Sequence, residues 1–150
     1  ASLMRQREGA ELLRDLASRI GVIDGVIDRI DTLVRANIPQ MRSRLEDRLK
    51  ELVSDQSVID AKRLELEIAL FADKLDVTEE CVRVRSHNKL FLKALHEEAG
   101  AGRKLNFLVQ EMNREANTVG SKANSAEIAH LVVGIKEELE KIREQLQNIE

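Results

Sequence analysis

The stretch GRKLNFLVQEMNREANTVGSKA, residues Gly102 to Ala123, decides the fold because its apolar residues follow the period of an α-helix. They recur every three or four positions, which places them along one side of a helix. The members of this stripe are Leu105, Leu108, Val109, Met112, Ala116, Val119 and Ala123. Because a helix with such a stripe must bury it against other elements, the stretch predicts a bundle of helices.

The other side of this helix is rich in amides and hydroxyls. Asn, Gln and Ser lower helix propensity in a helix interior, so their presence here calls for an explanation other than helix stability. Side chains four residues apart lie on neighbouring turns and can contact one partner. Three such sets are present: Asn113, Asn117 and Ser121; Gln110 and Arg114; Glu111 and Glu115.

Two longer apolar repeats lie outward from this stretch, one toward each end of the chain. Each recurs every three or four residues and forms the narrow seam that is typical of coiled coils. The first consists of Leu13, Leu16, Ile20, Ile23, Ile27, Ile30 and Val34, and the last of Ile128, Leu131, Val132, Ile135, Leu139, Ile142, Leu146 and Ile149. Because both seams need burial, we expect them to pack against each other.

Local signals divide the chain between the seams. Pro39 is expected to end the first helix, because proline supplies no amide hydrogen and biases the preceding residue away from helix. A second helix is predicted from Pro39 to residue 53, followed by a loop at residues 54–57 and a third helix from near Ile59. Within that third helix, Asp76 to Glu79 resembles a capping box and predicts a break or a restart.

The same patterns predict further details of these helices. Residues 100–102, with the sequence Gly-Ala-Gly, predict a turn that lets the next helix fold back antiparallel. Asn124, with Glu127 three residues later, is expected to cap the last helix. The side chains expected to face inward are Met41, Leu45, Leu49 and Leu52, then Leu64, Ile68, Phe71 and Leu75, then Val82, Leu90 or Phe91, and Leu95.

The composition favours an all-α fold. Aromatic residues make up 2% of the chain and charged residues 34%, and there is one proline, which together are typical of long helices rather than a sandwich or barrel. We therefore predict an elongated antiparallel helical bundle with coiled-coil-like seams. We expect an N-terminal helical hairpin arm over residues 1–57 and a C-terminal helical domain over residues 58–150.

Charge, cysteine content and hydropathy restrict the possible classes of protein. The net charge of −3 argues against a protein that binds nucleic acid through its bulk charge. The single Cys81 excludes an internal disulfide, fits a reducing cytoplasm and is expected in the core. No apolar run approaches the roughly 20 residues that span a bilayer, and no signal peptide is evident, so we expect a soluble, cytoplasmic protein. The two seams also lead us to expect self-association into a homo-oligomer.

Charged residues on the third helix form one stripe with two interpretations. They are spaced by three or four residues: Asp73, Asp76, Glu80, Arg83 and His87. An arginine between carboxylates can be a plain intrahelical ion pair. Alternatively, a carboxylate and His87 can flank a scissile phosphate while Arg83 stabilises its charge.

A second pair of carboxylates is also open to two interpretations. Glu111 and Glu115 lie one turn apart, and carboxylates at this spacing can share a hard divalent cation such as Mg²⁺ or Mn²⁺. Arg114 between them could instead neutralise both. A divalent cation suits phosphodiester hydrolysis, because it activates water and offsets charge on the leaving oxygen.

A resemblance to a known family gives these patterns a context. The string GRKLxFLxQEMNREANTxGSKA, followed by a helix that ends in QNIE, is similar to the signature of the YicC/YloC family of bacterial endoribonucleases. The strings DVTEECVRVRSH, from Asp76 to His87, and MRQREGAEL, from Met4 to Leu12, are similar to the same family's pattern. Asn106 departs from the aspartate expected there. The resemblance covers most of this chain and corresponds to the C-terminal half of family members.

The resemblance implies an endoribonuclease that hydrolyses RNA phosphodiester bonds with the help of a divalent metal cation, Mg²⁺ or Mn²⁺. It favours a catalytic role for Glu80, His87 and Glu111 and metal binding by Glu111 and Glu115. RNA contacts are expected from Arg83, Arg103, Lys104, Asn113, Arg114, Asn117, Ser121 and Lys122. With three Phe in the chain and two of them expected in the core, aromatic platforms for bases are lacking. Recognition should therefore rely on backbone and shape.

Two other functions stay open at this stage. The seams alone would suit a non-catalytic helical module for oligomerisation, whose active residues lie elsewhere. A helper that binds RNA without cutting it is the other possibility. The amide-rich side of Gly102–Ala123 favours a contact with RNA, because a scaffold gains nothing from Asn113, Asn117 and Ser121.

Overall fold

The structure, a computed structural model, describes residues 2–52, 61–97, 101–123 and 125–148. Its elements are five helices: α1 (Ser2–Leu52), α2 (Ala61–Leu75), α3 (Thr78–Ala94), α4 (Ala101–Lys122) and α5 (Ala126–Gln147). The described residues contain no strand, so the predicted all-α fold is confirmed. In that part of the chain, no helix is both long enough and apolar enough to cross a membrane.

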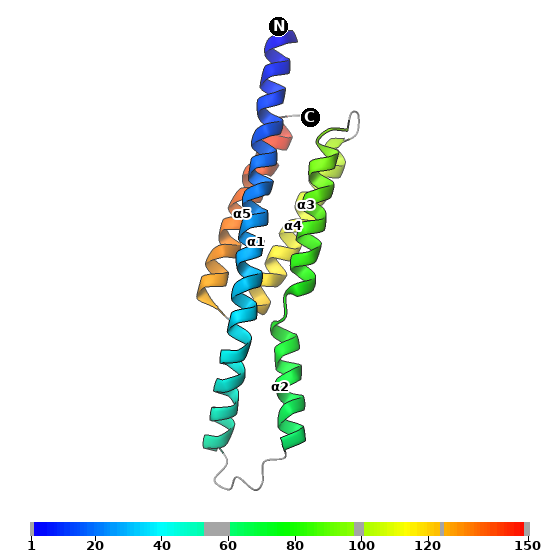
Figure 1. The fold of residues 1–150 in the computed structure, drawn as a ribbon. Coiled ribbons are helices and arrows are strands. Elements are labelled where there is room, and N and C mark those ends of the chain that lie inside the picture. The colour runs from blue at the N-terminus through cyan, green and yellow to red at the C-terminus, as the bar shows by residue number, and fades with distance from the viewer. Residues whose placement is uncertain (1, 53–60, 98–100, 124, 149–150) are drawn as a thin grey trace.

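Four helices enclose one core in the upper part of the molecule (Figure 1). The first half of α1 packs against α3 and α5, and α4 packs against the same two helices from the opposite corner. Each helix runs antiparallel to both of its neighbours (Figure 1). The core therefore belongs to α1, α3, α4 and α5 together, as the stripe on Gly102–Ala123 predicted.

The pairing of the first and last seams is confirmed. Residues of both seams lie in a single hydrophobic core with those of α3 and α4. Fully buried members include Ile20, Ile27 and Ile30 from α1 and Ile142 from α5. Leu13 and Leu131 are half-buried at the edge of this core. Burying branched aliphatic side chains at about 25 cal/mol per Å² supplies the main drive for folding in a chain so poor in aromatic residues.

The predicted end of the first helix at Pro39 is wrong, because α1 continues through Pro39 to Leu52. A proline inside a helix removes one hydrogen bond and clashes with the preceding turn, at a cost of about 3 kcal/mol. Packing offsets this cost here: Pro39 itself is exposed, while Met41 and Leu45 beside it line the contact with α2. Residues 2–52 thus form one continuous helix, where the sequence predicted two helices that meet at Pro39.

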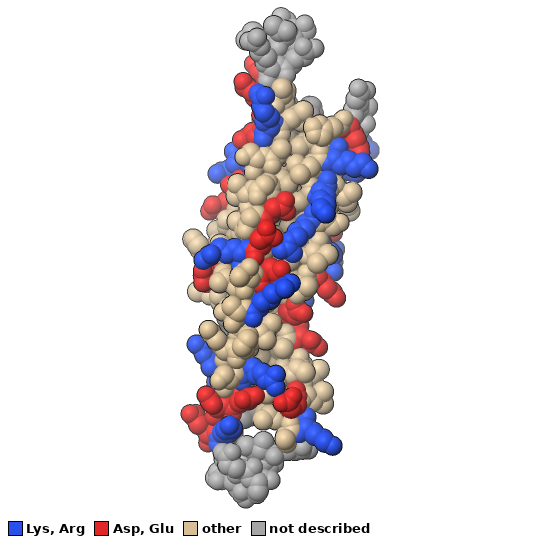
Figure 2. All heavy atoms as spheres, viewed as in Figure 1, with Lys and Arg blue, Asp and Glu red and all other residues tan. Residues whose placement is uncertain are grey.

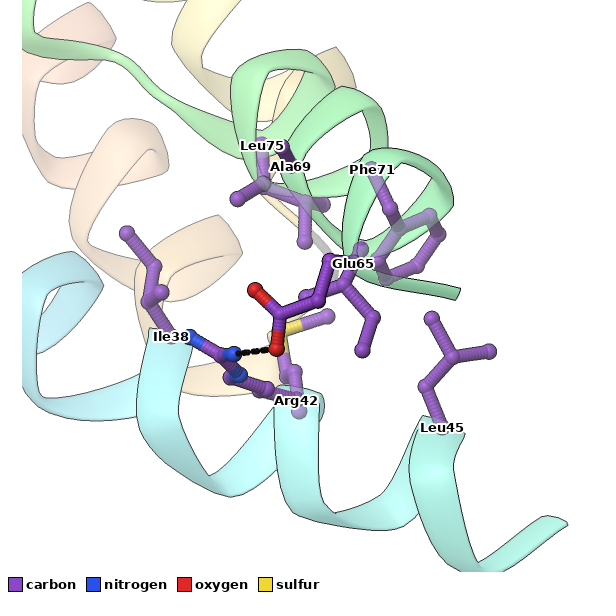
Figure 3. Close-up of a pocket in the computed structure, with 10 residues that line it drawn as sticks. Ile38, Arg42, Leu45, Glu65, Ala69, Phe71 and Leu75 are labelled. Atoms are coloured by element: carbon purple, nitrogen blue, oxygen red, sulfur yellow. Dashed lines mark hydrogen bonds and ion pairs between the residues drawn. The ribbon is translucent and has the colours of Figure 1, made fainter. Parts of the chain in front are cut away.

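The second half of α1 and α2 form an extension below the bundle, which we call the arm (Figure 1). An apolar cavity of about 140 Å³ lies between the two helices, and Figure 3 shows Ile38, Leu45 and Leu75 around it. Arg42 of α1 pairs with Glu65 of α2 across 2.9 Å at this cavity. The arm therefore has an apolar cavity of its own, separate from the core of the bundle.

Several expected features fall outside the described residues. The predicted loop at 54–57, the start of the third helix at Ile59, and the boundary between residues 57 and 58 lie in this group. So do Gly100 in the predicted turn, the cap Asn124, Ile149 and the side chains of Leu49 and Leu52. The division of the chain into residues 1–57 and 58–150 therefore stays a prediction.

The expected break at Asp76 is confirmed, since α2 ends at Leu75 and α3 begins at Thr78. On the inward side of α3 the predicted Leu95 is buried, and of the alternatives Leu90 and Phe91 it is Phe91 that is buried. The prediction for Val82 is wrong, because its side chain is 56% exposed. The buried positions of α3 follow a register that starts at the joint: Val77, Cys81, Val84, Asn88, Phe91 and Leu95. The restart at Asp76 shifts this register relative to the pattern on α2.

The seam of α1 offers a test of the core. Replacing the fully buried Ile27 with alanine should lower the free energy of unfolding by about 2–5 kcal/mol, because it leaves a cavity among aliphatic side chains. The matched control is Val22→Ala on the same helix, where the side chain is 48% exposed and the loss should stay within about 0.5 kcal/mol. Urea denaturation measures both, and equal losses would contradict the assigned core.

Candidate active site

Charged side chains of α3 and α4 meet at the edge of the core, where the two helices run side by side. Arg83 Nε donates a hydrogen bond to Glu115 Oε1 at 2.8 Å. Glu115 is only 8% exposed, so its carboxylate is largely removed from water. This contact raises the pKa of the Arg83 guanidinium above its ordinary value. The contact shows that Arg83 of α3 lies opposite Glu115 of α4 along the two helices.

Glu80 lies deeper in the same cluster. Its side chain is 3% exposed, and Oε1 lies 2.6 Å from Lys122 Nζ and 3.7 Å from an Arg83 guanidinium nitrogen. The other oxygen, Oε2, is buried and has no hydrogen-bond partner within the described part of the chain. A buried carboxylate requires nearby cations. Glu80 therefore holds an ammonium and a guanidinium group beside each other at the molecular surface.

Lys122 connects this cluster to the joint between α2 and α3. Its Nζ also lies 3.5 Å from the backbone oxygen of Asp76. Asp73, Asp76, Glu79 and Lys122 line an open depression of about 230 Å³. Glu79 contributes a further ion pair with Arg83, at 3.5 Å. Glu79 was predicted only as part of a helix cap, although its spacing of four residues from Arg83 was a signal for this ion pair.

His87 of α3 and Glu111 of α4 lie at one level of the same helix pair. His87 lies one turn beyond Arg83 on α3, and Glu111 lies one turn before Glu115 on α4. Because α3 and α4 are antiparallel, these two steps lead to the same level. The Nδ1 atom of His87 is buried without a hydrogen-bond partner among the described residues. Glu111 is half-buried, and within the described chain no side-chain partner is found for it.

We call Glu80, Arg83, His87, Glu111, Glu115 and Lys122 the α3–α4 cluster. Ion pairs join four of these predicted site residues, Glu80, Arg83, Glu115 and Lys122, while His87 and Glu111 lie one turn further along the same two helices. At about 100° per residue, Glu111 and Lys122 stay within about 40° of Glu115 around α4. The cluster combines anionic, cationic and imidazole groups, which is the set that acid–base chemistry on a phosphate requires.

The other predicted RNA contacts lie elsewhere on α4. Asn113 and Asn117 are exposed but lie about 160° around the helix from Glu115, on the side toward α5. Ser121 donates to the backbone oxygen of Thr118 at 3.0 Å, which gives this hydroxyl a local structural role. Lys104 pairs with Glu97 at 3.4 Å. The structure therefore does not bring these residues into the α3–α4 cluster.

Arg103 and Arg114 are exposed on the outward side of α4, and neither has an ion-pair partner among the described residues. Arg114 does not neutralise Glu111 and Glu115; Arg83 is the partner of Glu115 instead. The expectation that two Phe side chains lie in the core is wrong. Phe91 is fully buried, but Phe71 is 38% exposed and Phe107 57% exposed. Phe107 lies on the same outward side of α4 as the two arginines.

The carboxylates of the α3–α4 cluster provide a limited set of metal ligands. No group of three or more His, Cys, Asp or Glu side chains in the described residues is arranged to hold a metal ion. Glu111 and Glu115 supply two carboxylates on one side of α4, and one of these is bound by Arg83. Mg²⁺ commonly binds one or two carboxylates and completes its shell with water and substrate phosphates. Glu111 is the carboxylate of the pair that would be open to a cation held in that way, and Glu115 would have to release Arg83 to join it.

Polar contacts of two α3 residues, Asn88 and Arg85, with α1 hold α3 on the bundle, and none of these contacts was predicted. Asn88, 1% exposed, donates to Asp24 at 2.6 Å. Arg85 pairs with Asp28 at 2.7 Å and with Asp31 at 3.5 Å. Figure 2 shows basic side chains over α3 beside acidic ones toward α1. Because these contacts join distant segments, spacing along one helix gives no signal for them.

The cysteine expectation is confirmed, since Cys81 is free and fully buried. Burial, and to a lesser degree Asp31, raises the pKa of its thiol to about 11. The thiol therefore stays protonated near neutral pH and behaves as a small apolar side chain in the core beneath the α3–α4 cluster.

Comparisons with known proteins agree with the resemblance. The family model for the C-terminal part of YicC-like endoribonucleases matches residues 30–150. Two curated proteins named probable endoribonuclease YicC are similar to the chain over 147 residues: one from Clostridioides difficile (strain 630) at 45% identity, and one from Haemophilus influenzae (strain ATCC 51907 / DSM 11121 / KW20 / Rd) at 37%. These matches cover 98% of this chain and 50% of each relative. The chain thus spans about half the length of the curated relatives it matches.

The joint beside this cluster gives a pH-dependent test. Hydrogen bonds from the hydroxyl and backbone amide of Thr78 lower the pKa of Asp76 below its ordinary value of 3.8. A lowered pKa in the folded state adds stability above the unfolded-state value, and this stability is lost as pH falls through the folded-state value. Asp76→Asn should therefore be less stable than the parent at pH 6, with a difference that shrinks below about pH 4. Thermal unfolding measures it; a difference that grows on acidification would contradict this assignment.

Proposed function

The chain belongs to the YicC-like endoribonuclease family, as its C-terminal part, and from this premise we propose that it takes part in the hydrolysis of RNA phosphodiester bonds at the α3–α4 cluster. The observation that carries the proposal is the juxtaposition of Arg83 and Lys122 over the buried Glu80. Since the chain spans half the length of its relatives, the activity is proposed for the protein that contains it.

The two cations are proposed to hold the scissile phosphate. Arg83 is 46% exposed and Lys122 35% exposed on their side chains, so both remain accessible to an anion from solvent. A guanidinium presents its donors in a planar fork that matches two phosphate oxygens. Cations fixed before the substrate arrives stabilise the charge that develops in the transition state. Glu80, predicted as catalytic, acts in this proposal by positioning Arg83 and Lys122.

His87 and Glu111 are proposed to move the protons. An imidazole exchanges protons in the physiological pH range, and a carboxylate can accept one from water. In this proposal they act from one level, one turn from the Arg83–Glu115 pair, on a phosphate that Arg83 holds. The role of general base is assigned to Glu111 and that of general acid to His87.

A divalent cation, Mg²⁺ or Mn²⁺, is proposed as the cofactor, with Glu111 and Glu115 as the carboxylates that would hold it. When bound, it would lower the pKa of a coordinated water and offset negative charge. This proposal is supported by the position of the two carboxylates on the same side of α4, one turn apart. The groups of this chain keep their roles beside it: Arg83 and Lys122 orient the phosphate, and His87 donates the proton.

The remaining predicted contacts are proposed to guide the strand rather than to react. Arg103 and Arg114 are exposed cations without partners in the described chain, and Lys104 lies beside Arg103. Cations of this kind set affinity and its salt dependence. Asn113, Asn117 and Ser121 stay proposed contacts to 2′-hydroxyl or phosphate groups on the neighbouring side of α4.

Self-association is proposed to occur through the arm. Leu66 and Leu70 of α2 lie one turn apart and are 58% and 49% exposed. An open groove of about 820 Å³ is lined by Leu70, by Leu45 and Phe71, and by charged side chains that include Lys122 of the α3–α4 cluster. Neighbouring exposed leucines on a two-helix extension are typical of a surface that another protein chain covers. The cytoplasmic location stays a prediction.

The catalytic assignment is tested by two substitutions. Glu111→Gln and His87→Ala should each lower the single-turnover rate of RNA cleavage by about 10²–10⁴-fold, because each removes one partner in proton transfer. Glu137→Gln, an exposed carboxylate on α5, is the matched control and should keep the parent rate. A chelator should abolish cleavage in the parent. Full rates in folded variants would remove both residues from the site, and RNA binding without any products would favour the non-catalytic alternative.

The arm interface is tested by charge insertion. Leu66→Asp and Leu70→Asp together should lower the mass measured by light scattering at concentrations where the parent associates, because two carboxylates would be buried in the contact. Val133→Asp places the same charge at a 50% exposed site on α5 and should leave the mass unchanged. An unchanged mass for the double variant of an associating parent would exclude this surface.

A further inference from the structure

One stripe of α4 is not explained by the core or by the α3–α4 cluster. Its members are spaced by three or four residues and face outward: Arg103, Phe107, Gln110 and Arg114. At about 100° per residue these four positions fall within about 60° around the helix. All four are exposed. Single exposed apolar residues are common on proteins, so what sets Phe107 apart is its position in line with two arginines rather than its exposure alone.

The composition of the stripe points to a ligand. Phe107 is 57% exposed, which leaves much of its ring open to solvent. Arg103 lies one turn before it and Arg114 two turns after it, and neither has a partner among the described residues. An aromatic face between cations suits a group that is flat and apolar but joined to negative charge. An unpaired RNA base with its flanking phosphates has this chemistry.

The location relates the stripe to the cleavage chemistry. Phe107 lies one turn before Glu111 on α4, about 6 Å along the helix axis. A base resting on Phe107 would therefore lie next to the level of Glu111 and His87. Its neighbouring phosphates would extend toward Arg103 in one direction and toward the α3–α4 cluster in the other.

We propose that Phe107 is a stacking platform for an unpaired RNA base, with Arg103 and Arg114 holding the adjacent phosphates. The proposal rests on the proposed function and names its substrate class: single-stranded segments of RNA. A base within a duplex keeps both faces stacked on its neighbours and is not available to Phe107. The platform thus provides a contact to the base itself, in addition to contacts with backbone and shape.

The test separates the effect of an aromatic ring at position 107 from that of an apolar side chain without a ring. Phe107→Leu keeps an exposed apolar side chain without an aromatic ring, and Phe107→Trp restores a larger ring. Phe107→Leu should weaken binding of a short unstructured RNA by about 5- to 150-fold, as expected for one lost stacking contact, while Phe107→Trp should bind at least as well as the parent. Binding of a perfect duplex should change little in either variant. Leu90→Ala, at a 41% exposed apolar site on α3, is the control and should leave affinity unchanged.

Fluorescence gives a direct second readout. The chain contains no Trp or Tyr, so in it the indole of Phe107→Trp is the sole strong emitter. Its emission should be quenched by single-stranded RNA and not by an oligomer of the same length made of abasic ribose phosphates. Quenching by the abasic oligomer to the same extent, or parent affinity in Phe107→Leu, would overturn the proposal.

The outcomes also separate this inference from the proposed function. Quenching without any RNA cleavage would leave the stacking platform standing and remove the nuclease assignment for this site. If Phe107→Leu binds and cleaves RNA as the parent does, the nuclease assignment stands and the stacking platform is excluded. A lower mass of Phe107→Leu in light scattering, with unchanged RNA affinity, would show that Phe107 contacts another protein chain instead and would overturn the proposal.

Discussion

Four helices that each carry one aliphatic stripe can exclude water from all four stripes only by packing around a single core. This constraint governs the structure, because a chain with 2% aromatic residues has few large side chains with which to bury area. The seams of α1 and α5 meet α3 and α4, and all four contribute to one cluster of buried residues. The polar residues are then confined to the edges of the core and to the outward surface, where they can serve function.

The edge between α3 and α4 is where burial and charge meet. Glu80 lies inside the boundary of the core, so its carboxylate needs compensation by Lys122 and Arg83. The same two cations remain partly open to solvent on their other side. Carboxylates already hold both cations in place, so the positive groups are positioned before a phosphate arrives. A phosphate that binds them would take over part of the contacts that these carboxylates now make. The α1–α3 contacts of Asn88 and Arg85 keep α3 from shifting along the bundle.

Much of the fold could be predicted from periodicity, because each seam reports which side of a helix is buried. Periodicity could not predict where packing would outweigh the local preference of a residue. Pro39 carries a strong signal for a helix end, yet contacts of Met41 and Leu45 with α2 hold the helix together beyond it. Val82 was misplaced because the restart at Asp76 shifts the register of α3. Glu80, Arg83 and Glu115 were each predicted as candidate site residues. The pairing of Arg83 with Glu115 was not predicted, because it joins two helices and has no counterpart in spacing along one of them.

The central claim is that RNA binds over α3 and α4, across the cluster built around Glu80. Hydrogen–deuterium exchange with and without a short unstructured RNA tests this most directly, because amide protection reports where the ligand lies regardless of whether it is cleaved. Slower exchange is expected in Thr78–Ala94 and Ala101–Lys122 when RNA is present, with little change in the second half of α5. Protection confined to α5 or to the arm, with α3 and α4 unchanged, would contradict it.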